Sequence, residues 1–279
     1  MDTRDLNGKV AVVTGAGSGI GRSTALALAE RGADLALCDV DEEGLAETVA
    51  AAEKRGCKTF SLKVDVADPE AMQAFARNTE SALARVDILI NNAGIGVGGL
   101  FVDVPLDAWN KILNINILGV VHGCHAFLPG MIEAGRGGHV VNIASMAGYI
   151  QAPGMSAYSA TKFAVLGFSE SLRAELELHC IGVSAVCPGV INTPIVRSSA
   201  MYGQTNSPKL REEGIRAFER RNYSPDRVAQ GIVKAIHKNR GVAPISPEAW
   251  LGYRLKRFFP GLVAWFARRS ASAQRKRFD

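Results

Sequence analysis

The residues in this chain best suited to chemistry are a tyrosine and a lysine in Tyr158-Ser159-Ala160-Thr161-Lys162. Residues four positions apart on a helix share a face, so Tyr158 and Lys162 can point to the same place. A free phenol has a pKa of about 10 and is a poor base at neutral pH. A nearby ammonium would favour the phenolate and lower that pKa. The pair therefore predicts an acid/base centre, although the same spacing alone also occurs on ordinary amphipathic helices.

Other polar residues follow predicted strands at the same sheet edge. Ser145 ends Asn142-Ile143-Ala144-Ser145, and its hydroxyl could hold a substrate oxygen while Tyr158 transfers a proton. Asn91-Asn92-Ala93-Gly94 ends a second strand. Asn116 lies inside a long helical pattern, and because asparagine is a poor helix former it indicates a local irregularity or a buried polar role.

A glycine-rich turn, Thr14-Gly15-Ala16-Gly17-Ser18-Gly19-Ile20-Gly21, lies between a predicted strand and a predicted helix. Glycines let the backbone approach a pyrophosphate, and the helix N-terminus offers free N–H groups and partial positive charge. Such a turn alone could be structural, and its position between strand and helix favours nucleotide binding. We expect the adjacent Arg22 to point to solvent or to the pyrophosphate.

Asp39 closes the second predicted strand, where a carboxylate can accept both ribose hydroxyls of NAD and would repel the 2′-phosphate of NADP. The alternative is a solvated acid at a strand end. Asp65 and Val66, which end the third strand, could hold the adenine edge.

These residues are positioned by alternating strands and helices. Apolar runs predict strands at Lys9–Thr14, Asp34–Asp39, Thr59–Asp65, Val86–Asn91, His139–Ser145 and Ile181–Cys187. Amphipathic patterns predict helices at Ile20–Arg31, Glu43–Arg55, Pro69–Ala84, Leu106–Ala134 and Ser156–His179. The order predicts an α/β fold, a doubly wound Rossmann-type parallel sheet flanked by helices on both faces, with ligands bound beyond the carboxyl ends of the strands.

Over roughly residues 5–195 the chain resembles the short-chain dehydrogenase/reductase family, because the glycine turn, Asp39, Asn91–Gly94, Asn116, Ser145, Tyr158, Lys162 and Pro188-Gly189 occur in the family's order. The resemblance implies a catalytic tetrad of Asn116, Ser145, Tyr158 and Lys162. In that tetrad the tyrosine is the acid/base and the serine orients the substrate. The lysine also binds the nicotinamide ribose, and the asparagine holds a water on the proton relay.

The resemblance also implies that Ile191 and Thr193, in Pro188-Gly189-Val190-Ile191-Asn192-Thr193, grip the nicotinamide carboxamide. The expected NAD-binding set lies along the glycine turn, the strand ends and this segment: Gly15, Ser18, Gly19, Ile20, Gly21, Asp39, Asp65, Val66, Asn92, Gly94, Tyr158, Lys162, Ile191 and Thr193. The resemblance further implies a homotetramer, or a homodimer, built on the helices Leu106–Ala134 and Ser156–His179.

Composition sets wider limits. Residues 251–279 carry a net charge of +7 while the whole chain carries +5, so the rest nets −2 and gives no sign of nucleic-acid binding. The polar N-terminus predicts no signal peptide, and no uncharged stretch is expected to span a membrane. The five cysteines are expected to be reduced, so a cytoplasmic location is the expectation. No metal site is expected, since His122, Cys124 and His125 have no further ligands nearby.

Residues 1–247 are expected to form the catalytic domain, with a lid over the substrate at about 194–225. Its apolar start, with Ile195 and Met201, and the walls Ile95–Phe101, Met146 and Ile150–Met155 favour a lipid, steroid or aryl alcohol or ketone. Arg197 on the lid could bind an anionic group. A non-catalytic dinucleotide sensor on the same fold is the alternative.

Residues 248–279 form a basic, aromatic-rich extension that Pro260-Gly261 should divide into two short helices. The extension could pack on its own domain or on a neighbouring subunit, or it could contact a membrane surface peripherally. In any of these arrangements it could help to wall a hydrophobic pocket.

Overall fold

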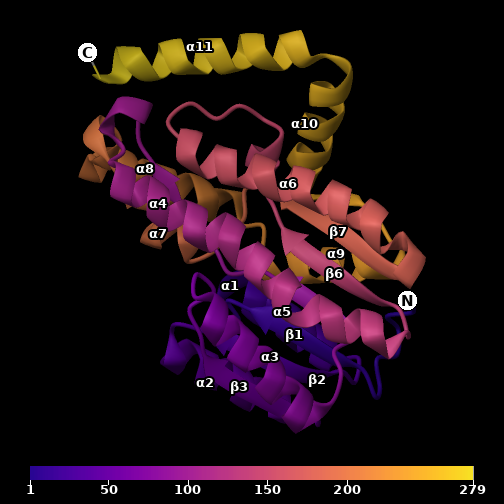
Figure 1. The fold of residues 1–279 in the computed structure, drawn as a ribbon. Coiled ribbons are helices and arrows are strands. Elements are labelled where there is room, and N and C mark those ends of the chain that lie inside the picture. Colours follow the sequence, from indigo (N-terminus) through magenta and orange to yellow (C-terminus); the bar gives the residue numbers. More distant parts are fainter. Residues whose placement is uncertain (279) are drawn as a thin grey trace.

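A seven-stranded parallel sheet forms the centre of the molecule, with the strand order β3-β2-β1-β4-β6-β7-β9 (Figure 1). The structure is a computed structural model that describes residues 1–278, and for residues 273–278 it describes the backbone alone. The strands are β1 (Val10–Thr14), β2 (Asp34–Asp39), β3 (Thr59–Lys63), β4 (Ile88–Asn91), β6 (Gly138–Ile143), β7 (Ile181–Pro188) and β9 (Val242–Ile245). The six predicted strands are confirmed, with ends shifted by one or two residues.

The sequence does not predict β9, the short strand at the far edge of the sheet. It contains Pro244, which has no backbone N–H to donate and argues against a strand. An edge strand has only one partner, and the pairing of β9 with β7 leaves the other side of Pro244 without a ladder. Proline is therefore tolerated here.

Helices cover both faces of the sheet, as predicted. On one face the buried core combines residues of α1 (Gly19–Ala29), α2 (Glu42–Glu53) and α9 (Pro225–His237) with the sheet. On the other face it combines α3 (Pro69–Leu83), α5 (Gly119–Ala134) and α6 (Ser156–Leu176). The strands are buried between these layers, which is why their sequences are continuous apolar runs.

The long helical pattern that starts at Leu106 is not one regular helix. It consists of α4 (Leu106–Leu113), a π-helical turn (Asn114–Leu118) and α5. The irregularity indicated by Asn116 is thus present, and it occurs at the residue itself. A π turn inserts an extra residue into the helical ladder and often marks a functional position.

This same stretch, Leu106–Ala134, is apolar enough and long enough to cross a membrane by length and composition. The expectation that no segment passes that test is therefore wrong. In the structure α5 packs against α3 and buries Phe127 and Met131 in the core, so its apolar residues have a place inside the fold.

The segment after β7 carries short elements before the last layer helix. These are α7 (Ile195–Ser198), β8 (Ala200–Met201), a 3₁₀ turn (Gly203–Asn206) and α8 (Pro208–Arg221). β8 pairs in parallel with β5 (Val97–Gly98), which ties this segment to the loop after β4. Other 3₁₀ turns lie at Phe101–Asp103, Met146–Gly148 and Glu177–His179.

Two helices end the chain, α10 (Pro247–Phe258) and α11 (Pro260–Phe278), and they divide at Pro260 as predicted. In Figure 1, α11 lies outside the two helical layers and crosses above α6. Within the described chain its main packing partner is α10.

Candidate active site

A cavity of about 770 Å³ opens at the carboxyl ends of the strands, where the sequence predicts ligand binding. Nearly all of the predicted site residues line it: Gly15, Ser18, Gly19, Ile20, Asp39, Asp65, Val66, Asn92, Gly94, Ser145, Tyr158, Lys162, Ile191 and Thr193. Gly21 and Asn116 are buried behind its wall. One hollow therefore joins the predicted nucleotide site to the tyrosine–lysine pair.

The glycine turn owes its shape to backbone angles and close contacts that other residues could not adopt. Gly15 and Gly19 have φ values of +65° and +52°, in the left-handed region that favours glycine. A Cβ on Gly21 would lie 2.0 Å from the Gly15 carbonyl oxygen, so the first turn of α1 can sit directly on the loop.

The N-terminus of α1 is left without a side-chain cap. Ser18 makes no capping hydrogen bond, whereas Asp41 and Asp68 accept backbone N–H bonds at the starts of α2 and α3. Uncapped N–H groups at a helix start are free to bind an anion. The turn therefore fits the phosphates of a dinucleotide.

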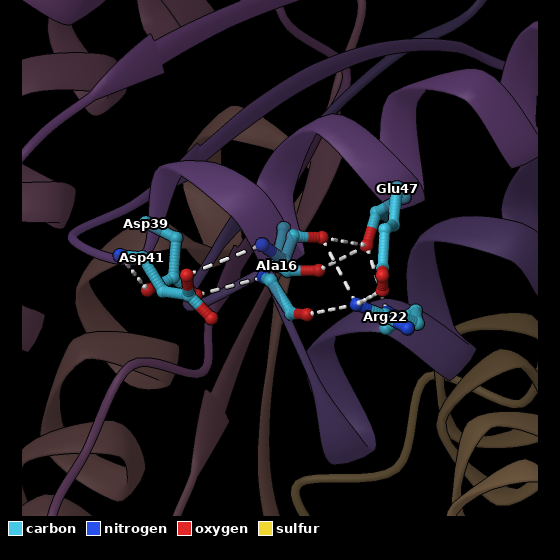
Figure 2. Close-up of polar contacts among 8 residues, drawn as sticks. Ala16, Arg22, Asp39, Asp41 and Glu47 are labelled. Atoms are coloured by element: carbon cyan, nitrogen blue, oxygen red, sulfur yellow. Dashed lines mark hydrogen bonds and ion pairs between the residues drawn. The ribbon is translucent and has the colours of Figure 1, made fainter.

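Asp39 lies beside this turn at the end of β2. Its carboxylate accepts hydrogen bonds from the backbone N–H groups of Gly17 at 2.7 Å and Asp41 at 3.0 Å (Figure 2). A Cβ on Gly17 would lie 2.9 Å from Asp39 Oδ2, so the glycine makes room for the acid. These two backbone N–H groups hold the Asp39 carboxylate at the rim of the cavity.

Arg22 does not point to solvent or to the pyrophosphate site as expected. Its guanidinium donates to the carbonyl oxygen of Gly17 at 2.5 Å and to Glu47 at 2.8 Å, on the far side of Ala16 from Asp39 in Figure 2. It also donates to Thr48 Oγ1 at 3.0 Å. These bonds tie α1 to α2 and hold the Arg22 guanidinium away from Asp39.

Ser145, Tyr158 and Lys162 meet at the other end of the cavity. Tyr158 and Ser145 both line this end, and the Ser145 Oγ accepts from Ala147 N at 3.1 Å. Lys162 is buried, its Nζ donates to the Ile143 carbonyl at 2.8 Å, and it lies 5.6 Å from the centre of the Tyr158 ring. Ser145 follows β6 directly, while Tyr158 and Lys162 share one face of α6.

The pKa values in this cluster are governed by burial. Burial raises the pKa of Tyr158, while the hydrogen bond with Ser145 acts to lower it. Burial also lowers the pKa of Lys162 to about 8. The lowering of the tyrosine pKa expected from the sequence is thus not present in the protein alone, because desolvation outweighs the lowering by Ser145. The positive charge of an oxidised nicotinamide would act in the required direction.

Asn116 is fully buried in the π turn, and its side-chain amide both accepts a hydrogen bond from the backbone of Ile95 and donates one to it. Its Oδ1 accepts from Ile95 N at 2.8 Å, and its Nδ2 donates to Ile95 O at 3.0 Å and to Thr161 Oγ1 at 3.2 Å. The side chain therefore joins the loop after β4 to the helix that carries Tyr158 and Lys162.

The segment expected to grip the nicotinamide follows β7, and a residue that the sequence does not single out holds it. Glu248, at the start of α10, accepts from Val190 N at 3.1 Å and pairs with Arg221 at 2.8 Å. Burial acts to raise the pKa of Glu248, but the hydrogen bonds, that of Arg221 foremost, give a net lowering. Only the folded structure brings Glu248 to this segment, so no local pattern reveals it.

The remaining walls of the cavity are mainly apolar. They include Val97, Met146, Ile150, Met155 and several lid side chains, namely Ile195, Val196, Met201, Leu210, Ile215 and Phe218. Phe101, expected in this wall, is 69% exposed and does not line the cavity. Arg197, the expected anion-binding lid residue, instead pairs with Glu219 outside the cavity.

Two cations do reach this part of the cavity. Arg211 lines it, but its guanidinium donates to the carbonyl oxygens of Arg197 at 2.7 Å and Ser199 at 3.1 Å. Lys111 is exposed at the rim. The lid arginine thus fastens α8 to α7.

The C-terminal extension supports the cavity from behind. Among the residues whose side chains are described, up to Ser272, none of α10 or α11 lines it, which corrects the expectation that the extension could form a wall. Instead Gly252 packs against Ile150, one of the lining residues, and the Tyr149 hydroxyl donates to the Ala249 carbonyl at 2.8 Å.

The His122-x-Cys124-His125 sequence is divided among different neighbours. His122 Nδ1 lies 2.8 Å from the Val66 carbonyl, and Cys124 accepts a long hydrogen bond from Asn91. No group of three potential metal ligands occurs among the described residues.

Comparison with known proteins places this geometry in context. The family model described as short chain dehydrogenase matches residues 9–201. The probable oxidoreductase EphD of Mycobacterium tuberculosis is 42% identical over 260 residues, and the match covers 92% of this chain but 44% of EphD. The chain thus spans less than half the length of that relative.

The putative oxidoreductase SadH of the same organism is 42% identical over 246 residues, which is 87% of either chain. Among solved structures, a short chain dehydrogenase/reductase from Burkholderia phymatum in complex with NAD superposes with a TM-score of 0.83. It is 32% identical, and the match covers 92% of this chain and 96% of that one.

Proposed function

Since the chain belongs to the short-chain dehydrogenase/reductase family, we propose that it is an oxidoreductase that transfers hydride between NAD and a hydrophobic alcohol or ketone. The observation that carries the proposal is that one continuous cavity joins the predicted nucleotide site to the tyrosine–lysine pair. It has a glycine turn and Asp39 at one end, Ser145, Tyr158 and Lys162 at the other, and apolar walls beyond them.

Tyr158 acts as the acid/base in this proposal. In alcohol oxidation its phenolate would take the hydroxyl proton of the substrate, and in ketone reduction its phenol would donate that proton to the carbonyl oxygen. Ser145, which lines the same end of the cavity as Tyr158, holds the substrate oxygen. Lys162 stabilises the phenolate and binds the nicotinamide ribose. Asn116, by holding the Ile95 loop against α6, keeps the proton path in place.

NAD is the proposed cofactor, and when bound it supplies or accepts the hydride. The uncapped start of α1 suits its pyrophosphate, and the Asp39 carboxylate suits the two free hydroxyls of its adenosine ribose. A 2′-phosphate at that ribose would face Asp39, with Arg22 already bonded to Glu47. Asp65 and Val66 would border the adenine, while Ile191 and Thr193 would hold the carboxamide.

The proposed substrate is a bulky apolar alcohol or ketone of the lipid, steroid or aryl type. Residues 194–221 contribute seven apolar side chains to the cavity, Pro194 included, while Arg197 and Arg211 are bonded to the lid itself. These two arginines already have partners, so the cavity can take an uncharged apolar molecule without leaving either of them unpaired.

A screen of NAD reduction tests the proposal, with steroids, long-chain alcohols, aryl alcohols and small polyols as substrates. We expect the highest kcat/KM for one of the hydrophobic classes. Faster turnover of polyols would reject the substrate class. NADH binding without turnover of any alcohol or ketone would instead indicate a dinucleotide sensor on this fold.

A further inference from the structure

The C-terminal helices carry an outward surface that the fold does not use. We call it the arm surface, and it combines exposed apolar and basic side chains of α10 and α11: Leu251, Phe258, Phe259, Leu262, Trp265 and Phe266 with Arg254, Arg257, Arg268 and Arg269. Four of its six apolar members are more than half exposed, up to 69% for Phe258. Large apolar side chains grouped in this way usually mark an interaction site.

The arm surface points away from the body of the protein. On α11, Val263 is buried and Ala264 and Ala267 are half-buried, while Leu262, Trp265 and Phe266 are exposed. The inner face is thus made of small side chains, and the large aromatic ones lie on the outer face. Figure 1 shows α11 outside the helical layers. Packing on its own domain therefore leaves the outer face of α11 uncovered.

The charge of the arm surface distinguishes between two candidate partners, a second copy of this chain and a lipid surface. From Ala249 to Phe278 the sequence contains no acidic residue. The arginines lie among the aromatic rings: Arg269 is 4.9 Å from the Trp265 ring and Arg254 is 5.8 Å from the Trp250 ring. Two such surfaces brought together across a twofold axis would set like charges against each other. A plane of anionic lipid headgroups, by contrast, matches both the cations and the apolar rings.

We propose that α10 and α11 dock on an anionic lipid surface, with their aromatic side chains in the headgroup region and their arginines on lipid phosphates. The contacts of α10 with the body of the protein strengthen the proposal. Tyr253 packs edge-on against Tyr149 at 5.4 Å, and Gly252 touches Ile150, which lines the cavity. Docking would therefore bring lipid close to an apolar cavity wall. The docking does not depend on the proposed oxidation.

Co-sedimentation with vesicles tests the proposal. The full chain should pellet with vesicles of equal parts phosphatidylcholine and phosphatidylglycerol at low salt, should bind far less to phosphatidylcholine alone, and should be released by salt. A basic residue near an anionic surface contributes about fivefold in affinity. The double variant Arg268→Glu, Arg269→Glu should thus lose more than tenfold. Trp265→Ser with Phe266→Ser should also weaken binding, while retaining its dependence on salt.

Two substitutions outside the arm provide matched controls. Leu178 is 91% exposed and Arg77 is exposed, so Leu178→Ser and Arg77→Glu should bind vesicles like the wild type, with all variants compared by circular dichroism melting. Failure of the wild type to pellet at low salt would overturn the proposal, as would equal losses in arm and control variants. A smaller assembly of the arm variants in lipid-free sedimentation, without vesicle binding by the wild type, would show that a second copy covers the arm surface.

Discussion

Tyr158 is half-buried and lines the cavity together with Ser145 and Lys162. Replacing it with phenylalanine removes the proton carrier and leaves the ring in place. We expect Tyr158→Phe to lower kcat by 10²–10⁴-fold, the range typical of general acid–base catalysis, with NADH affinity changed much less. Stopped-flow turnover and NADH fluorescence titration measure the two quantities. Tyr223→Phe is the control, and more than a tenth of wild-type activity in Tyr158→Phe would exclude the proposed role.

Lys162 gives the cofactor-free protein a specific pH dependence. Its pKa is lowered by burial from 10.5 to about 8, so the unfolded chain holds this proton more tightly than the native state. The cost of the buried charge is present in full below pH 8 and is relieved as the pH rises towards 10.5. The free energy of unfolding of the wild type, relative to Lys162→Met, should therefore increase over this window by up to about 1.4 kcal/mol per pH unit. Urea unfolding at several pH values measures this free energy. A difference between wild type and Lys162→Met that does not vary with pH would show that the pKa of Lys162 is not lowered.

Asp39 should set the choice between NAD and NADP. Hydrogen bonds to a charged group contribute about 1.5–3 kcal/mol, so Asp39→Ala should reduce kcat/KM for NAD by about tenfold or more. It should also improve NADP, because the repulsion of the 2′-phosphate is lost. Steady-state kinetics with both cofactors test this, with Glu43→Ala as a nearby acidic control. Equal kcat/KM for the two cofactors in the wild type would contradict the assignment.

Residues next to strand ends could be placed in the cavity from the sequence, because the carboxyl ends of parallel strands meet at one edge. Asp39 and Ser145 are examples. The arginines could not. Arg22 and Arg197 have long side chains whose partners, Glu47 and Glu219, lie on other helices, so their direction depends on packing between elements.

At the scale of elements, Glu248 connects its own helix, α10, to the segment after β7 and to the end of α8. One carboxylate oxygen holds Val190 N, beside the proposed carboxamide-binding residues, and the other pairs with Arg221 at the end of α8. We therefore expect Glu248→Ala to weaken NAD binding by about tenfold through loss of charge-assisted hydrogen bonds. Isothermal titration with NAD measures this, Glu213→Ala on the exposed side of α8 is the control, and a partial recovery in Glu248→Gln would support a positioning role. Unchanged affinity in Glu248→Ala would show that the Val190 segment needs no such support.

The elements themselves were predictable to different degrees. The early strands and helices repeat one pattern with capped starts, such as Asp41 and Asp68, and their ends shift little. The lid was predicted only as a long connection. Its α7, β8 and α8 are short or polar, and they are held by the β5–β8 pair and by Arg211 rather than by a periodic apolar stripe.

At the scale of the whole molecule, α5 and α6 present outward faces that the monomer does not cover. Leu118, at the end of the π turn, and Phe163 on α6 are both 42% exposed. A Cβ on Gly167, one turn after Phe163, would meet no atom within 4 Å. This face of α6 is therefore open enough for another helix to pack closely against it. We predict a homotetramer, or a homodimer, that buries these two helix faces.

Placing a carboxylate at the centre of this interface tests the assembly. In a buried contact an unpaired charge costs several kcal/mol, so the double variant Leu118→Glu, Phe163→Glu should sediment as a smaller species than the wild type at micromolar concentration. Arg77→Glu, at an exposed position of α3, outside both interface helices, should leave the assembly intact. Because the same α6 also carries Tyr158 and Lys162, dissociation should lower thermal stability and activity together. A wild-type monomer in analytical ultracentrifugation would contradict the prediction.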